Sequence, residues 1–119
     1  ATAKRQLVER AGGDTVRTKV FDVVRGYDWP TPYTGRALRN DFIARWHGRE
    51  DALMETLAKE RTDYFAAAQA DNINTAVIWA GEGIDLIDEV EDAAVLVRRI
   101  GAQTEAQLQR GAELLRAIG

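Results

Sequence analysis

The sequence predicts a mainly α-helical fold with one short β segment, and three observations lead to this class. Leu38, Phe42 and Trp46 recur every four residues, so they share one face of a helix. A second apolar seam repeats in steps of four and three residues from position 93 to position 118. Residues 15–24 form the one run that is rich in β-branched residues and alternates as a strand does.

The length, cysteine content and charge of the chain exclude several classes of protein. The 119 residues suffice for one domain, or a piece of one, with a modest core. The chain has no cysteine, which excludes disulfides and thiolate sites. The net charge is −3 and the basic residues are scattered, which argues against nucleic-acid binding. Apolar runs are short and no secretory leader is visible, so we expect no membrane span and a cytoplasmic location.

The first 33 residues read as a helix, a strand and a loop. A helix is predicted over residues 1–11, ended by the glycine pair at 12 and 13. Because one strand cannot form a sheet, we expect the strand over 15–24 to pair with a segment outside this chain. The chain begins with Ala1 and its single methionine is Met54, which fits a processed product or a fragment of something longer.

Residues 25–33 form a loop, since two prolines fix extended backbone there and remove amide donors. Tyr27, Trp29 and Tyr33 supply flat apolar surface in this loop. Two interpretations are open: a loop that contacts a substrate or partner, and a connector whose aromatic side chains lie down on the fold.

Residues 34–119 read as a helical body that completes a single domain. In the stretch 34–51 a helix is predicted that stops at the left-handed Gly48, and Glu50 and Asp51 begin a longer helix that runs to about residue 70. The inward residues of the longer helix are Leu53, Leu57, Tyr64, Phe65 and Ala68, with an ion pair between Glu55 and Lys59. The last helix is predicted from 92 to the C-terminus. Within it, Gly101 and Gly111 permit close packing, or Thr104 restarts the helix through a capping box.

Two groups of residues are candidates for binding. In WAGEG, residues 79–83, glycines let backbone amides approach a ligand, and the next residues can begin a short helix whose N-terminus attracts an anion. Many tight turns share this pattern. Arg36, Arg39 and Asn40 can hold a carboxylate, nitro or phosphate group, or can tie loop carbonyls to the fold, which their spacing favours.

No residue of this chain is predicted to be catalytic or to bind a metal. His47 is the single histidine, and its place between Trp46 and Gly48 favours a helix-end role. An acidic cluster matches no calcium loop and suits the start of a helix. Its members are Glu82, Asp85, Asp88, Glu89, Glu91 and Asp92.

Four segments, taken in order, resemble the C-terminal region of nitronate monooxygenases, also called 2-nitropropane dioxygenases. They are DTVRTKVFD (14–22), WP…Y.GRALRN (29–40), RWHGRED (45–51) and WAGEG..LI (79–87). The resemblance runs over nearly the whole chain, and GRALRN and WAGEG are fairly specific only when found together.

The resemblance implies a domain of an FMN enzyme that oxidises alkyl nitronates with dioxygen to carbonyl compounds and nitrite. It implies a TIM barrel, absent from this chain, with a helical appended domain that covers the flavin. The barrel carries the phosphate-binding turns and the catalytic histidine, so the fragment alone should be inactive and bind FMN weakly or not at all. His47 does not match the catalytic position.

The same resemblance assigns roles residue by residue. Gly35, Arg36, Arg39 and Asn40 match the loop-to-helix motif, which implies that Arg36, Arg39 and Asn40 contact the nitronate substrate. WAGEG, residues 79–83, matches a turn late in the family's sequences, here called the late turn. The resemblance implies cofactor contacts from four of its residues: Trp79, Gly81, Glu82 and Gly83. Glu82 stands where many members have glutamine, so a donor is lost and a charge added at that position.

A second class of function is also open. The seam of the final helix runs almost to the C-terminus, and exposed apolar surface tends to find a partner. The alternative is a free-standing helical interaction module, without catalysis, that forms a homodimer through this helix.

Overall fold

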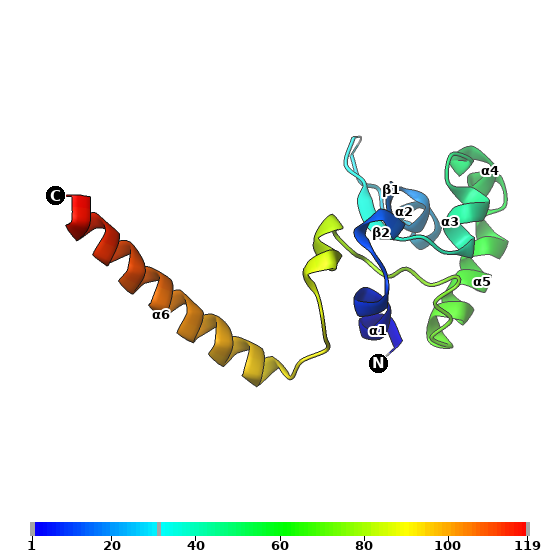
Figure 1. The fold of residues 1–119 in the computed structure, drawn as a ribbon. Helices are drawn as coiled ribbons and strands as arrows, with labels where there is room; N and C mark the ends of the chain where they lie inside the picture. Colours follow the sequence, from blue (N-terminus) through cyan, green and yellow to red (C-terminus); the bar gives the residue numbers. More distant parts are fainter. Residues whose placement is uncertain (1, 31, 119) are drawn as a thin grey trace. The chain divides into compact units, whose positions relative to one another are not determined.

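A computed structural model describes residues 2–30 and 32–118 (Figure 1). The chain divides into two compact units, Ala1–Asp88 and Glu89–Gly119. Helices dominate, and the described residues contain one two-stranded antiparallel sheet, so the predicted fold class is confirmed. Ala1 and Gly119, at which predicted helices begin and end, and Thr31 of the predicted loop lie outside the described residues.

The first unit contains nine helices and strands in its described residues, ending with the short 3₁₀ helix η2. In chain order the segments are α1 (Thr2–Glu9), η1 (Gly12–Asp14), β1 (Thr15–Thr18), α2 (Val20–Arg25), β2 (Gly35–Leu38), α3 (Asp41–Trp46), α4 (Glu50–Glu55), α5 (Leu57–Gln69) and η2 (Glu82–Leu86). The loop predicted between the strand and the next element is present between α2 and β2.

The predicted strand over 15–24 is wrong in length and in its partner. Only β1 is extended, and it pairs with β2 of the same chain, Thr15 opposite Leu38 and Thr18 opposite Gly35. The next residues form α2 because Val20, Phe21 and Val24 then share one face, and all three are fully buried. The strand partner therefore does not have to come from elsewhere.

The helix predicted over 34–51 also begins later than expected. Residues 35–38 form β2, and α3 starts after Asn40, whose side-chain oxygen accepts a hydrogen bond from the Ile43 backbone N–H at 3.0 Å. Such an N-cap satisfies an otherwise unpaired amide of the first turn. The left-handed stop at Gly48 is confirmed by its φ of 78°.

Two helices, α4 and α5, replace the single helix predicted over 50–70. The Thr56 hydroxyl donates to the carbonyls of Ala52 and Leu53, and this back-bonding disturbs a helix at the point where α4 ends. Phe65 is 44% exposed rather than inward. Lys59 pairs with Asp63 at 2.6 Å, not with the predicted Glu55.

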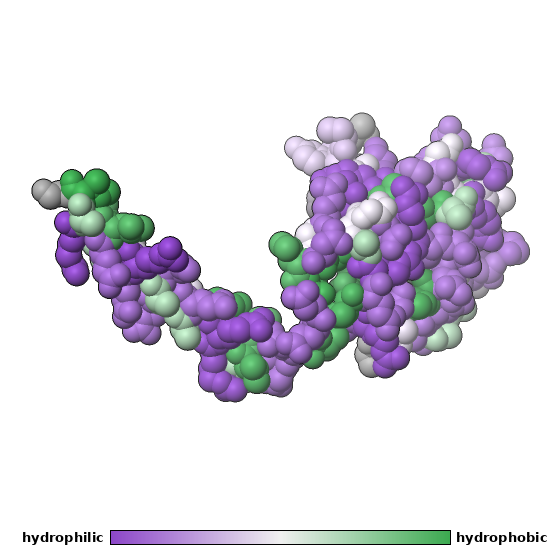
Figure 2. All heavy atoms as spheres, viewed as in Figure 1, coloured by the Kyte–Doolittle hydropathy of each residue, from purple (hydrophilic) through white to green (hydrophobic). Residues whose placement is uncertain are grey.

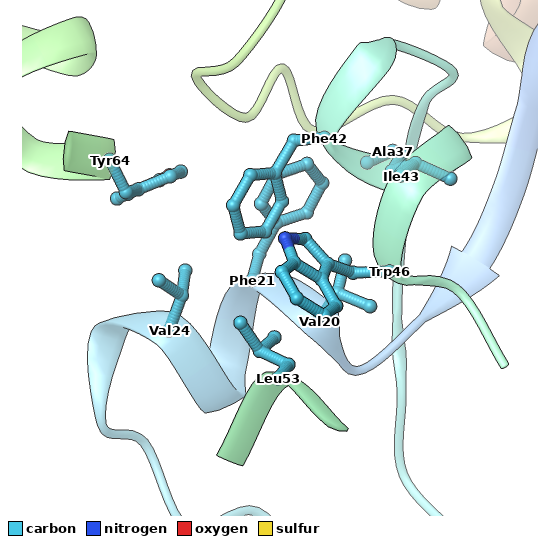
Figure 3. Packing of buried hydrophobic residues seen from close by; sticks show 9 residues of the cluster. All are labelled: Val20, Phe21, Val24, Ala37, Phe42, Ile43, Trp46, Leu53 and Tyr64. Carbon is cyan, nitrogen blue, oxygen red and sulfur yellow. The ribbon is translucent and has the colours of Figure 1, made fainter. Parts of the chain in front are cut away.

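The core gathers side chains from α2, β2, α3, α4 and α5 (Figure 3). The rings of Phe21 and Phe42 stack with centroids 5.6 Å apart, and the Tyr64 ring packs against both. Leu53 is fully buried on the α4 side of the same cluster. Phe42 and Trp46 of the predicted apolar stripe therefore face this core. Its third member, Leu38, does not share their helix face, because it lies in β2 and packs in a separate cluster with Ala80 and Ile84.

The second unit contains α6 (Ala93–Ile118), which confirms the predicted last helix. Asp92 starts it: its side-chain Oδ1 accepts from the backbone N–H groups of Ala94 and Val95 at 2.9 and 3.3 Å. The helix is continuous at Thr104, whose hydroxyl donates to the Ile100 carbonyl, so the predicted restart is wrong. Figure 2 shows apolar side chains exposed along α6.

Although α6 has 26 residues, neither it nor any other helix in the described part of the chain is long and apolar enough to cross a membrane.

Candidate functional site

The late turn lies beside β2 and extends the sheet by a third segment. The Leu38 backbone N–H donates to the Ile78 carbonyl at 2.9 Å, and the Ala80 N–H donates to the Arg36 carbonyl at 3.1 Å. An antiparallel bridge joins Ala37 to Trp79 between these two bonds. The structure thus brings together GRALRN and WAGEG, which are about forty residues apart in sequence.

Gly35 and Trp79 fit closely. A Cβ added at position 35 would lie 2.2 Å from Cζ3 of the Trp79 indole, much less than any real contact distance. Only glycine therefore fits at position 35 with the indole in this place. The indole also meets the Phe21 ring edge-on, at 5.8 Å between centroids and 80° between planes.

A cavity of about 380 Å³ opens where α2, the following loop, β2 and Trp79 meet. Rings form much of its wall, with Thr34 and Gly35 completing it. The other lining residues are Asp22, Arg25, Tyr27, Trp29, Tyr33 and Trp79. Trp29 and Tyr33 are 60% and 65% exposed, so these loop side chains form the open part of the wall.

Asp22 is the acid of this cavity. Asp22 lies on α2 and is largely buried. Burial raises the pKa of its carboxyl, and the positive charge of Arg25 opposes this rise. Arg25 itself lies over the Tyr27 ring, 4.6 Å from the centroid, and donates to the Tyr27 hydroxyl at 3.3 Å. The Asp22 carbonyl accepts from the Tyr27 N–H, which fixes the start of the loop.

Arg36, a predicted substrate contact, is held by two partners. Its Nη2 lies 2.5 Å from Oε1 of Glu82, and its Nη1 donates to the Thr15 hydroxyl at 3.0 Å. Glu82 is thus tied to β2, and Arg36 lines neither this cavity nor a second hollow near α1. The pair joins one predicted substrate residue to one predicted cofactor residue.

Arg39 and Asn40 lie elsewhere, at the second hollow of about 160 Å³. The Arg39 carbonyl accepts from Arg10 at 3.3 Å. Asn40 caps α3 with its oxygen, and its Nδ2 donates to the carbonyls of Ile73 and Ala76 at 3.3 and 3.1 Å. Asn40 therefore ties the loop after α5 to the fold, the structural role that the spacing favoured. Arg36, Arg39 and Asn40 do not share one hollow.

The glycine turn leads into η2, a single short 3₁₀ segment. Gly81 and Gly83 are exposed, and Gly12 packs so closely on this turn that a Cβ there would lie 2.5 Å from the Glu82 carbonyl oxygen. Oδ1 of Asp85 accepts from the Gly12 N–H at 2.8 Å. These contacts attach the turn to η1.

His47 and two residues of the acidic cluster, Glu91 and Asp92, have partners within the chain. His47 is the C-terminal cap residue of α3, and its Nδ1 lies 3.2 Å from the Thr18 hydroxyl. Glu91 pairs with Arg99, and Asp92 caps α6. Among residues 2–30 and 32–118, no group of three acidic or histidine side chains is placed to hold a metal ion.

The sequence alone did not single out Asp22 and Arg25. Their spacing of three residues puts them on one face of a helix, just before a loop with three aromatic residues. That signal depends on recognising residues 20–25 as a helix, and their β-branched composition favoured a strand.

Comparison with known proteins supplies one relative. No protein-family model matches the chain, and no solved structure matches it. A curated nitronate monooxygenase of Metarhizium robertsii is 31% identical over 99 residues, which are 80% of this chain. The chain spans only 27% of the length of that relative.

Proposed function

We propose that this chain is the C-terminal covering domain of an FMN-dependent nitronate-monooxygenase-like oxidoreductase. In the whole enzyme a TIM barrel holds the flavin, which supplies oxidation of an alkyl nitronate by dioxygen to a carbonyl compound and nitrite. The covering domain excludes water and shapes the substrate pocket, as closing elements of enzymes commonly do. In this proposal the catalytic residues belong to the barrel, so we expect the chain by itself to be inactive.

The observation that carries this proposal is the meeting of the two motifs. GRALRN and WAGEG carry the resemblance, and they are joined by the bridge between Ala37 and Trp79 and by the ion pair between Arg36 and Glu82. Residues of one functional surface are expected to come together in space, whereas two chance matches are not. The identity with the relative from Metarhizium robertsii supports the same assignment.

The residues of the turn do not fit the phosphate of FMN. The Glu82 carboxylate repels an anion, and Arg36, the cation beside it, is already paired with Glu82. The turn is a five-residue 3₁₀ segment rather than the start of a long helix. In this proposal, residues outside the chain hold the phosphate. The predicted cofactor residues Trp79, Gly81, Glu82 and Gly83 then contact the isoalloxazine rings of the flavin and not its phosphate.

A chimera tests the proposal. The matched region of the Metarhizium robertsii relative is replaced by this chain, and flavin content and nitrite release from an alkyl nitronate are measured. We expect FMN to be retained and nitrite to be released, whereas this chain alone gives neither. A folded, flavin-loaded chimera without nitrite release overturns the proposal, as does FMN-independent activity of the chain alone.

The exposed face of α6 favours a second candidate, an interaction module that forms a homodimer. Val97, Leu108 and Leu115 are each about two-thirds exposed or more, on a helix with none of its residues buried. Sedimentation equilibrium of the chain separates the candidates. A dimer that Leu108→Glu converts to a monomer supports the module, and a monomer at all concentrations excludes it.

A further inference from the structure

We propose that the cavity between Asp22 and Trp79 binds a small, uncharged, flat heteroaromatic compound that donates an N–H to the Asp22 carboxylate. This proposal does not depend on the covering-domain assignment, because it rests on the cavity alone.

The walls of the cavity select for a ring. Its volume of about 380 Å³ lies within the range of roughly 300–1,000 Å³ usual for small-molecule sites. Tyr27, Trp29, Tyr33 and Trp79 contribute four aromatic side chains to one hollow. Aromatic rings prefer offset or edge-to-face neighbours, and a flat ligand offers both a face and edges. The loop side chains are more than half exposed, so a ligand reaches the cavity without unfolding.

The charges of the cavity select for an uncharged ligand. Asp22 gives it a negative group, and the positive charges of Arg25 and Lys19 both act on that carboxylate. An anion would meet Asp22, and a cation would meet Arg25, which already occupies the face of Tyr27 where a cation would sit. A neutral ring avoids both repulsions.

Asp22 gives the site its polar specificity. A carboxylate has about four acceptor positions, and the Asp22 backbone N–H uses one of them. The residue lies on α2, lines the cavity and is 7% exposed. An N–H donor that enters the cavity thus meets a desolvated acceptor, where a hydrogen bond to a charged group is strongest.

Benzimidazole and 1-methylbenzimidazole form a matched pair of probes, since they share ring and shape and only the first has an N–H. Binding is followed by NMR through the indole N–H signals. Trp29 and Trp79 line the cavity, whereas Trp46 is buried in the core with its Nε1 donating to Glu60, and serves as internal control. We expect the first two signals to shift on titration and the Trp46 signal to stay.

The hydrogen bond predicts about tenfold tighter binding of benzimidazole than of its methyl derivative. Asp22→Ala should remove that preference, and Trp29→Ala, at an exposed position, should weaken both probes by about three- to tenfold. Arg39→Ala, at the other hollow, is the control and should change neither. Equal affinities of the two probes, a shifted Trp46 signal, or tighter binding of benzyltrimethylammonium would each overturn the proposal.

Discussion

Replacing Gly35 by alanine tests the contact on which the site is built. The new Cβ would lie 2.2 Å from the Trp79 indole, so something must move. The Trp79 backbone is held to β2 by the bridge at Ala37 and its flanking hydrogen bonds, so the indole must rotate. Rotation breaks its edge-on contact with Phe21.

The expected magnitude follows from two opposing effects. Overpacking costs about 1–3 kcal/mol, while replacing a glycine within a strand gains roughly 0.5–1 kcal/mol through a less flexible unfolded chain. The overpacking cost exceeds the gain from replacing glycine, so the free energy of unfolding should fall by about 1 kcal/mol. A loss of this size lowers Tm by about 4–8 °C.

Thermal unfolding by circular dichroism and the Trp79 indole NMR signal are the two assays. Gly13→Ala is the matched control, since nothing lies within 4 Å of a Cβ at that exposed position. We expect Gly35→Ala to lower Tm and move the Trp79 signal, and Gly13→Ala to do neither. An unchanged Trp79 signal and Tm in Gly35→Ala would refute the packing described for this site.

Three further changes test the fold around the site. Leu53→Ala should lower the free energy of unfolding by about 2–5 kcal/mol in urea titration, because the side chain is fully buried, whereas Met54→Ala, exposed beside it, should cost less than about 0.5 kcal/mol. Asn40→Ala removes the cap of α3 and should lower the free energy of unfolding by about 1–2 kcal/mol; an unchanged free energy of unfolding would argue against the cap. Burial raises the pKa of Asp22 above 3.8, so the native state holds its proton more tightly and the folded chain loses stability as pH rises through that pKa. Asp22→Asn should therefore raise Tm at neutral pH and have no such effect well below pH 3.8; a gain only in acid would contradict this sign.

The sequence predicts the helical class because periodic apolar residues need only local spacing. Phe42 and Trp46 face the core as their spacing indicated, and α6 covers the predicted seam from Ala93 to Ile118. Caps are similarly local, and Asp92 and Gly48 lie where helix-end chemistry places them.

Tertiary contacts decided the places where the prediction was wrong. Three of the six residues 20–25 are valines, yet the segment is helical because burying Val20, Phe21 and Val24 on one face outweighs a weak intrinsic preference for a strand. Residues 35–38 fit a helix by spacing, but pairing with β1 makes them a strand. Neither motif alone predicts the cavity, because Asp22 and Trp79 are far apart in sequence and line one cavity only in the folded chain.

The most direct experiment links the packing of Trp79 to the activity proposed for the whole enzyme. Gly35→Ala and Gly13→Ala are made in the chimera with the Metarhizium robertsii relative, and nitrite release is measured at equal flavin content. We expect Gly35→Ala to lower nitrite release, since it displaces Trp79 where the two motifs meet, and Gly13→Ala to leave it unchanged. Equal nitrite release from the two variants would contradict this expectation.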